Sequence, residues 1–358
     1  MYPIDYVIEI LVLFFSINVL GVTEYMALLE VQDLCTQFKT DQGIVKAVRN
    51  VSFHVEQGEA LGIVGESGSG KSQTMYTIIG LLADNAQVTS GKVSFDGKDI
   101  SRGNFATKKE YEKMMQELRG NTMAMIFQDP MTFLNPILKI GTQLIEPIMN
   151  HHHVSREEAK KQAIELMKKV GIPSPEKRIE QYPFEFSGGM RQRIVIAIAL
   201  ANSPKLIIAD EPTTALDVTI QAQVLELIDE LKKQSNSAII MISHDLGVVA
   251  KLCDRIAIMY GGKIVEIGTD KDIFYDPKHP YTQGLLNCIA NPEDDDDEPL
   301  QPIAGSPPDL LNPPKGCPFV DRCPKAMKIC KNELPEVTSF SETHECACWL
   351  LKKEAVAK

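Results

Sequence analysis

Short apolar segments alternate with longer amphipathic segments along most of the chain. Residues 28–38 and 47–55 alternate apolar and polar side chains, which predicts two β-strands buried on one face. Nearly continuous apolar runs predict strands buried on both faces, and these runs occupy residues 59–64, 123–127, 205–211 and 238–242. Helices are expected between the strands, for example at residues 72–82 and 218–234. The pattern therefore predicts an α/β fold.

Two pairs of turn-forming residues predict β-hairpins. Asp96-Gly97 follows the strand-like residues 91–95, and Gly261-Gly262 joins residues 255–260 to residues 263–267. Glycine after an aspartate or another glycine is typical of the tight turns that connect antiparallel strands. We therefore expect antiparallel pairing in both places, beside the buried strands.

Residues 129–185 are expected to be mostly helical. Prolines within this region should interrupt the helices, because proline lacks the backbone donor that a helix interior needs, and they are Pro130, Pro136 and Pro147. Three consecutive histidines at residues 151–153 invite a metal interpretation. Neighbouring side chains diverge, however, and no acidic or cysteine partner lies nearby in the sequence. A solvated loop is therefore the favoured interpretation of the histidines.

The first 25 residues do not fit the globular pattern. An apolar run lies between residues 10 and 20, but a membrane-spanning helix needs about 20 apolar residues. Acidic Asp5 and Glu9 occupy positions where a signal peptide carries Lys or Arg. A membrane-surface anchor is one interpretation. We favour the other, in which translation begins at Met26, and we assign residues 1–25 no function.

A phosphate-binding motif follows the strand expected at residues 59–64. Residues 65–72 fit the pattern G-x-x-x-x-G-K-[ST], with the sequence Gly65, Glu66, Ser67, Gly68, Ser69, Gly70, Lys71 and Ser72. Glycines let backbone N–H groups surround a phosphate, and the following helix adds positive potential. Lys71 should reach the β- and γ-phosphates, and the Ser72 hydroxyl should bind Mg²⁺. The strand–loop–helix setting favours this interpretation over a chance glycine-rich turn.

Polar residues end three of the predicted buried strands. Gln128 follows one strand, Asp210 and Glu211 end the next, and His244 comes just after the last. Ligands of open α/β sheets bind beyond the carboxyl ends of the strands. We expect Gln128 to contact Mg²⁺ and the attacking water, Asp210 to hold Mg²⁺, Glu211 to polarise the water, and His244 to contact the γ-phosphate. The alternatives are a surface glutamine and a satisfied core histidine.

A second anion-binding element precedes the helix expected at residues 194–201. Ser187-Gly188-Gly189 lies at its N-terminus, where backbone N–H groups are again available. One γ-phosphate does not need two such elements from one chain. Two chains packed head to tail would use both, with the second element closing over nucleotide held by the partner. Asp217 follows in a tight loop after the Asp210-Glu211 pair.

Composition and charge narrow the functional classes. The chain has 358 residues, 44% of them hydrophobic and 24% charged, which is ordinary for a globular protein of about two domains. Its formal net charge is −11. An acidic chain with no dominant basic surface is a poor candidate for non-specific nucleic-acid binding, so we expect no nucleic-acid partner.

The C-terminal region has a composition of its own. Residues 291–314 contain an acidic run and several prolines, which predicts a solvated linker. Beyond it, five cysteines fall within 32 residues, at Cys317, Cys323, Cys330, Cys346 and Cys348. An intracellular nucleotidase sits in a reducing compartment, so these thiols favour a metal or cluster site over disulfides. Their spacing differs from the common C-x₂-C zinc pattern, and loosely placed thiols remain the alternative.

Taken together, these motifs resemble those of the ATP-binding subunits of ABC transporters. GESGSGKS resembles the Walker A motif, FSGGMRQR at residues 186–193 the ABC signature, and LIIADE at residues 206–211 the Walker B motif. Gln128 resembles the Q-loop glutamine, ALD at residues 215–217 the D-loop, and His244 the switch histidine. The resemblance covers about residues 28–348. It implies an ATPase with a RecA-like core, an antiparallel β subdomain and a helical signature subdomain.

Further segments resemble the oligopeptide/dipeptide and nickel importers within that family. They are FQDPMTFLNP at residues 127–136, HPYTQGLL at 279–286 and GCPF at 316–319. Phe133 departs from the usual serine, Phe184 stands where histidine is common, and Phe38 where many ABC proteins have tyrosine. The resemblance implies that Phe38 and residues 65–73, with Gln73, bind ATP. It also implies that Ser187, Gly188, Gly189 and Gln192 serve the partner's site.

The resemblance carries expectations about cofactors and partners as well. It implies ATP, Mg²⁺ and a [4Fe–4S] cluster held by the C-terminal cysteines; because the family's last ligand precedes a residue like Trp349, the expected ligands are Cys317, Cys323, Cys330 and Cys348. The implied partners are a second ATPase subunit, paralogous or identical, two transmembrane permeases and an extracellular or periplasmic peptide-binding protein. The implied location is the cytoplasmic face of the membrane.

The expected organisation has four parts. An N-terminal extension (1–25) precedes an ABC ATPase domain (26–290) whose helical subdomain covers about residues 129–200. A linker (291–314) and a cysteine-containing extension (315–358) follow.

Other classes of the superfamily fit the sequence less well. DNA-repair ATPases insert long coiled coils or zinc modules before the signature, whereas only 58 residues lie between Gln128 and Ser187 in this chain. Translation-type ABC proteins need two cassettes. Among the functions that the resemblance implies, import of peptides is favoured, with nickel or another solute as the alternative substrate.

Overall fold

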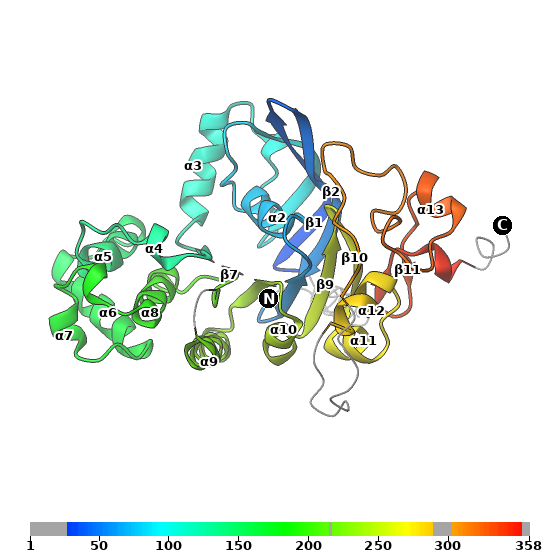
Figure 1. Cartoon of the computed structure of the whole chain (residues 1–358). Coiled ribbons are helices and arrows are strands. Elements are labelled where there is room, and N and C mark those ends of the chain that lie inside the picture. Colours follow the sequence, from blue (N-terminus) through cyan, green and yellow to red (C-terminus); the bar gives the residue numbers. More distant parts are fainter. Residues whose placement is uncertain (1–26, 215–216, 289–301, 353–358) are drawn as a thin grey trace, which may run out of the picture.

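A computed structural model describes residues 27–214, 217–288 and 302–352. The apolar N-terminal segment and the acidic run of the expected linker lie outside the described residues. Within the described part, the strands form two sheets and the helices pack around them (Figure 1). The predicted α/β fold is confirmed.

The larger sheet provides the platform for the strand-end residues. Its strand order is β11-β12-β10-β9-β3-β8-β7-β6. Five neighbouring strands run parallel: β9 (Arg255–Tyr260), β3 (Ala60–Val64), β8 (Ala238–Ser243), β7 (Leu206–Asp210) and β6 (Met123–Ile126). Antiparallel pairing then adds β10 (Lys263–Thr269), β12 (Glu345–Cys346) and β11 (Thr338–Ser339). The extreme C-terminal strands thus extend the sheet of the ATPase domain.

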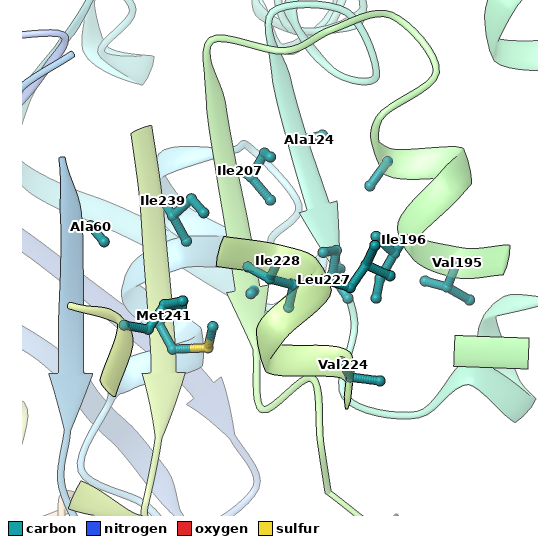
Figure 2. Close-up of a cluster of buried hydrophobic side chains, with 14 of the residues drawn as sticks. Ala60, Ala124, Val195, Ile196, Ile207, Val224, Leu227, Ile228, Ile239 and Met241 are labelled. Carbon is teal, nitrogen blue, oxygen red and sulfur yellow. The ribbon is translucent and has the colours of Figure 1, made fainter. Parts of the chain in front are cut away.

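Apolar side chains fill the space between this sheet and its helices. Figure 2 shows Ile207 and Ile239 of the central strands close to Leu227 and Ile228 of helix α9 (Val218–Ser235). These side chains belong to one buried cluster that also includes Ile196. Removing several methylene groups from such a core costs about 2–5 kcal/mol. The packing therefore fixes the ends of the strands at which the polar residues stand.

The smaller sheet is antiparallel and has the order β2-β1-β4-β5. It consists of β1 (Leu29–Thr40), β2 (Gly43–Val55), β4 (Ala86–Phe95) and β5 (Lys98–Asp99). Asp96 and Gly97 turn β4 into β5 with φ angles of 51° and 75°, so the hairpin predicted there is confirmed. The second predicted hairpin is also confirmed, since β9 and β10 pair antiparallel around Gly261 and Gly262.

Helices of the region after Gln128 gather at one end of the molecule, away from the C-terminal strands (Figure 1). They are α4 (Pro130–Phe133), α5 (Ile140–His151), α6 (Arg156–Lys169), α7 (Pro175–Arg178), the short 3₁₀ helix η2 (Pro183–Glu185) and α8 (Gly188–Ala199). The expectation that Pro147 interrupts a helix is wrong, because Pro147 lies inside α5. Burial of Leu144, Ile145 and Ile148 on either side holds the helix through the missing hydrogen bond.

Two other helices have bounds that differ from the expected ones. Helix α2 (Lys71–Ile78) ends before residue 82, because Gly80 adopts φ = 70° and the Leu81 N–H donates to the Tyr76 carbonyl in a C-terminal cap. Helix α8 begins at Gly188 rather than residue 194, because the Ser187 side chain caps it by accepting from the Met190 N–H. The signature glycines are therefore part of the helix.

The remaining elements connect these parts. They are η1 (Arg102–Asn104), α3 (Lys108–Leu118), α10 (Leu246–Leu252), α11 (Asp270–Tyr275), α12 (Pro280–Leu286), α13 (Lys328–Asn332) and η3 (Trp349–Leu351). In the part of the chain that the structure describes, no helix combines the length and apolar character required to cross a bilayer. Of the three consecutive histidines, His151 ends α5 and the other two are exposed.

The C-terminal extension, residues 302–352, packs on the ATPase domain. The part of the expected linker that the structure describes is anchored to β2: the Lys46 N–H donates to the Leu310 carbonyl at 2.9 Å, and the Arg49 guanidinium donates to the Pro314 carbonyl at 3.1 Å. Residues 302–314 are thus a partly exposed segment held along an edge of the smaller sheet. This path brings the extension beside the phosphate-binding motif.

Candidate nucleotide-binding site

The phosphate-binding loop lies between β3 and α2 and has the backbone geometry that its glycines allow. Gly68 and Gly70 adopt φ angles of 78° and 100°. A Cβ atom at Gly70 would lie 2.4 Å from the Ala47 carbonyl oxygen, and one at Gly65 would lie 2.1 Å from the Met259 carbonyl oxygen. The loop is therefore pressed against β2 and β9, and side chains at these glycines would displace it.

Lys71 points back into the loop. Its Nζ donates to the carbonyl oxygens of Gly65 at 2.6 Å and Glu66 at 3.0 Å, and the side chain is buried. Burial lowers the pKa of the Lys71 ammonium, while the nearby carboxylates of Glu211, Asp210 and Glu66 oppose that shift. The ammonium is thus held where a phosphate entering the loop would meet it.

Ser72 and Asp210 face each other across the loop. The Ser72 hydroxyl donates to Asp210 Oδ1 at 2.9 Å, and the Tyr76 hydroxyl lies 3.3 Å from Asp210 Oδ2. Burial raises the pKa of the Asp210 carboxyl, and the two hydroxyl donors oppose the shift. Burial and the neighbouring carboxylate raise the pKa of Tyr76 to about 12. A hydroxyl and a carboxylate oxygen in contact are suitable ligands for Mg²⁺. The sequence did not single out Tyr76.

Glu211 is surrounded by the other strand-end residues. Its Oε1 lies 3.3 Å from His244 Nδ1, and its Oε2 accepts from Gln128 Nε2 at 3.1 Å and from the Thr214 hydroxyl at 2.9 Å. Glu211 adopts φ = 46°, a left-handed conformation that turns its carboxylate from the strand toward these partners. The structure thus brings together Gln128, Glu211 and His244 beside the loop.

Ser187-Gly188-Gly189 does not take part in this assembly. Figure 1 shows α8 in the helical group, well apart from α2. A Cβ atom at Gly188 would have no neighbouring atom within 4 Å, whereas a Cβ atom at Gly189 would lie 2.8 Å from Ile220 Cγ2. The Gln192 side chain is buried in its own chain, so it does not lie on an exposed face of this element. The exposed part of the element is its first turn.

Three other residues expected near nucleotide have local roles that the structure shows. Phe38 is half-buried on β1, where it pairs with Val45 and Ala86 of the neighbouring strands. The carbonyl of Gln73, in the first turn of α2, accepts from the Thr77 hydroxyl. Asp217 caps α9 by accepting from the Ile220 N–H at 2.9 Å and is exposed. Their contacts with ATP and with a partner stay predictions.

The C-terminal cysteines approach one another but do not form a preassembled metal site. Among the described residues, no group of three or more His, Cys, Asp or Glu side chains is arranged to hold a metal ion. Burial, together with the neighbouring thiols of Cys330, Cys348 and Cys323, raises the pKa of the Cys317 thiol to about 12. These four sulfurs are thus electrostatic neighbours, and the expected iron–sulfur cluster is not confirmed.

Two family models match the chain. The model described as ABC transporter matches residues 48–214, and the model described as Oligopeptide/dipeptide transporter, C-terminal region, matches residues 265–330. The chain is 54% identical to the oligopeptide transport ATP-binding protein OppD of Bacillus subtilis, over 92% of this chain and 90% of that protein. It is 51% identical to the dipeptide transport ATP-binding protein DppD of Bacillus subtilis, over 91% and 96%.

A solved structure supports the same kinship at lower identity. The ATP-binding cassette MJ0796, in a dimeric post-hydrolysis state bound to ADP and phosphate, is 27% identical to this chain. The two structures superpose with a TM-score of 0.58, over 67% of this chain and 98% of MJ0796.

Proposed function

The chain belongs to the ABC transporter family, among the ATP-binding subunits of oligopeptide and dipeptide importers, and we propose that it hydrolyses ATP in a site that it shares with a second ABC subunit. One observation carries the proposal: the phosphate loop and the catalytic candidates meet at one edge of the sheet, while the signature turn faces open space elsewhere. A single chain therefore supplies half of each of two sites.

The residues of the phosphate-binding loop and of the strand ends have distinct roles in the proposed reaction. Lys71 stabilises the negative charge of the β- and γ-phosphates. Glu211 accepts a proton from, or polarises, the water that attacks the γ-phosphorus. His244 and Gln128, which contact Glu211, orient that carboxylate and the water. Mg²⁺ bound by Ser72, Gln128 and Asp210 would neutralise phosphate charge when present.

The signature turn would complete the partner's site. Ser187, Gly188 and the N-terminal amides of α8 offer hydrogen-bond donors to a γ-phosphate bound by another chain. The dimeric state of the MJ0796 cassette, which was solved with bound ADP and phosphate, supports pairing of two subunits. Gln192 is buried within its own chain, and its contact with the partner's nucleotide stays a prediction. The second subunit is either a paralogue or a second copy of this chain, and ATP would bind the two together until it is hydrolysed.

The helical region after Gln128 is the proposed docking surface for two transmembrane permeases. Several large apolar side chains are exposed there, namely Phe133, Ile137, Leu138 and Met149. Ile137 is 79% exposed. Apolar side chains that gather on one exposed region are typical of protein contacts. Because this region begins at the Q-loop, movement of Gln128 with nucleotide state would be transmitted to the permeases, on the cytoplasmic face of the membrane.

We expect Ile137→Asp to uncouple the subunit from transport. A charge in a buried interface costs enough to lower peptide-stimulated ATP hydrolysis of the reconstituted transporter roughly tenfold. Hydrolysis by the isolated subunit should not change, because Ile137 is not among the residues proposed to bind or hydrolyse ATP. Tyr275→Asp, at an 87% exposed position outside the helical region, is the matched control. Wild-type peptide uptake by Ile137→Asp would contradict this docking surface.

The permeases and an extracellular or periplasmic binding protein determine which substrate is transported. Oligopeptides or dipeptides are the favoured cargo, because relatives that are 54% and 51% identical to this chain are oligopeptide and dipeptide transport subunits. Nickel or another solute is the alternative within the same group. Uptake of labelled peptides by cells that lack this chain distinguishes the two.

A [4Fe–4S] cluster on the C-terminal extension is part of the proposal. Its support is local: the backbone N–H of Met327 donates to Cys330 Sγ at 3.5 Å, and the Cys317 thiol has the thiols of Cys323, Cys330 and Cys348 as electrostatic neighbours. Such bonds stabilise thiolate ligands of iron–sulfur clusters. Cys346 instead pairs with Glu266 in the sheet. Cys317, Cys323, Cys330 and Cys348 are therefore the proposed ligands.

Anaerobically purified protein should contain about four iron and four acid-labile sulfide atoms per chain, as the proposed cluster type requires. Cys348→Ser should lose most of both. Cys346→Ser, the matched control two residues away, should retain them. Zinc in place of iron, or iron retained by Cys348→Ser and lost by Cys346→Ser, would contradict the ligand assignment.

A further inference from the structure

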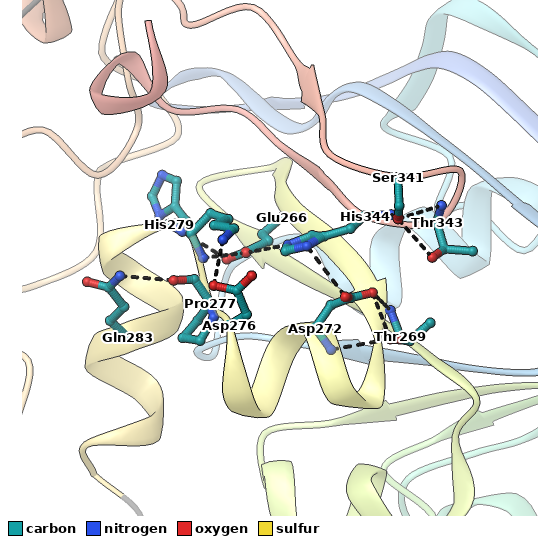
Figure 3. A network of polar contacts seen from close by, with 11 residues as sticks. Glu266, Thr269, Asp272, Asp276, Pro277, His279, Gln283, Ser341, Thr343 and His344 are labelled. Carbon is teal, nitrogen blue, oxygen red and sulfur yellow. Dashed lines mark hydrogen bonds and ion pairs between the residues drawn. The ribbon is translucent and has the colours of Figure 1, made fainter. Parts of the chain in front are cut away.

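The C-terminal extension is fixed to the ATPase domain by a buried polar network. Figure 3 shows Glu266 of β10 between His344 of the extension and the segment that starts α12. Glu266 Oε1 lies 2.9 Å from His344 Nε2, and the carboxylate accepts from the backbone N–H groups of Lys278 and His279 at 2.6 and 3.0 Å. His344 Nδ1 also lies 3.7 Å from Asp272 Oδ1. The extension therefore has a defined position on the sheet.

From this position, Arg322 reaches the phosphate-binding loop. Its Nη1 and Nη2 donate to the two carboxylate oxygens of Glu66 at 2.7 and 3.1 Å. Nη1 also donates to the Tyr260 hydroxyl at 3.1 Å, while Nε and Nη2 donate to the carbonyls of Ala304 and Ile303 at 2.9 and 3.0 Å. All five N–H donors of a guanidinium are thus in use. The side chain is only 6% exposed.

Three groups of Glu66 form hydrogen bonds to other residues. Its carboxylate binds Arg322, its backbone N–H donates to the Tyr281 hydroxyl at 3.0 Å, and its carbonyl accepts from Lys71 Nζ at 3.0 Å. Tyr281 in turn packs against Tyr260 and Phe319, with ring centroids 4.5 and 5.3 Å away. The residue next to the first glycine of the loop is therefore clamped from the extension and from α12.

We propose that Arg322 is a positioning residue for the phosphate-binding loop, through its bidentate ion pair with Glu66. The inference rests on the proposed function, because it assumes that the loop binds ATP. Arg322 does not contact the region where phosphate would bind. It fixes the Glu66 backbone, whose carbonyl is one of the two that hold Lys71 in the nucleotide-free loop. The extension thereby sets the affinity of the loop for ATP.

The physical reason lies in the geometry of the pair. A planar guanidinium bound to both carboxylate oxygens fixes orientation as well as distance, which a single ammonium cannot do. The buried guanidinium would also leave donors unpaired if Glu66 moved, which costs free energy. Movement of the loop away from its present conformation is therefore opposed by the extension. A loop released from this restraint would lose ATP affinity.

The test is a double-mutant cycle on ATP binding. The dissociation constant of a fluorescent ATP analogue is measured for the full chain with Arg322→Gln, with Glu66→Gln and with both. We expect each single change to weaken binding roughly fivefold or more, a size typical of coupled sites. The dissociation constant of the double variant should be no larger than that of the single variant with the lower affinity, because the two residues act as one unit. Arg322→Lys should give an intermediate loss.

Controls separate positioning from folding of the extension. Lys325→Gln removes a charge from the same segment, where the Lys325 Nζ lies 3.5 Å from Gln283 Oε1, and it should leave the affinity unchanged. Additive losses in the cycle, or wild-type affinity in Arg322→Gln, would overturn the inference. Failure of the wild-type chain to bind ATP would instead overturn the proposed function. If Arg322→Gln unfolds the extension, Glu66→Gln with Arg322→Lys completes the cycle.

Discussion

Glu211→Gln is expected to abolish steady-state ATP hydrolysis while leaving ATP bound. The side-chain oxygen of glutamine can still accept hydrogen bonds from Gln128 and Thr214, but glutamine cannot take a proton from water. General-base contributions of this kind are about 10²- to 10⁴-fold, so the rate of phosphate release should fall by at least about 100-fold. Lys71 and Ser72 are untouched, so the nucleotide should be retained. Phosphate release and the amount of bound ATP are the two measurements.

The control for this variant is Asp84→Asn, which removes an exposed carboxylate paired with Lys108. It should hydrolyse ATP as the wild type does. If Glu211→Gln released phosphate at the normal rate, the base would be another residue. A folding defect would not explain a loss of activity, because glutamine has the same size as glutamate and can accept the same hydrogen bonds from Gln128 and Thr214.

Gly188→Asp is expected to produce a similar separation from the other side of the shared site: ATP binds to the chain's own loop but is not hydrolysed. An aspartate there would repel the γ-phosphate held by the partner and block the donors of the α8 N-terminus. Because no atom lies within 4 Å of a Cβ at this position, the substitution has room. A carboxylate also suits a helix N-terminus. We expect hydrolysis to fall by about 100-fold with unchanged thermal stability.

Gly189→Asp serves as the comparison, since its Cβ would lie 2.8 Å from Ile220 Cγ2. It should lower the melting temperature as well as the activity. Normal hydrolysis by Gly188→Asp would show that the signature turn does not serve a nucleotide site. Loss of ATP binding to the monomeric Gly188→Asp chain would place the turn in its own chain's site instead.

Much of the site could be predicted because parallel strands end at a common edge. Gln128, Asp210, Glu211 and His244 each follow an apolar run, and the structure brings them together for that reason. The direction of the strands and their burial are sufficient to predict that these side chains lie at the same edge of the sheet. The glycines of the phosphate loop could be predicted likewise, because their spacing matches a motif with a physical function.

Other features depend on contacts between distant residues, which no local pattern reports. Tyr76 and Thr214 hold Asp210 and Glu211 through hydroxyls that have no motif of their own. Arg322 is 256 positions from Glu66, and only the fold of the extension brings them together. Pro147 was expected to break a helix, but burial of its neighbours outweighed the lost hydrogen bond. Tertiary packing decided each of these cases.

Sharing of the site between chains is the central claim, and Phe184 offers a direct measurement of it. Phe184 lies three residues before Ser187, is 71% exposed and stacks on Tyr182. Replacing it with the photoreactive aromatic p-benzoylphenylalanine, in a Glu211→Gln background, places a cross-linker beside the signature. With ATP bound, we predict cross-links to the β1 or phosphate-loop segment of another ABC subunit. Cross-links confined to the same chain, or independent of ATP, would contradict a shared site.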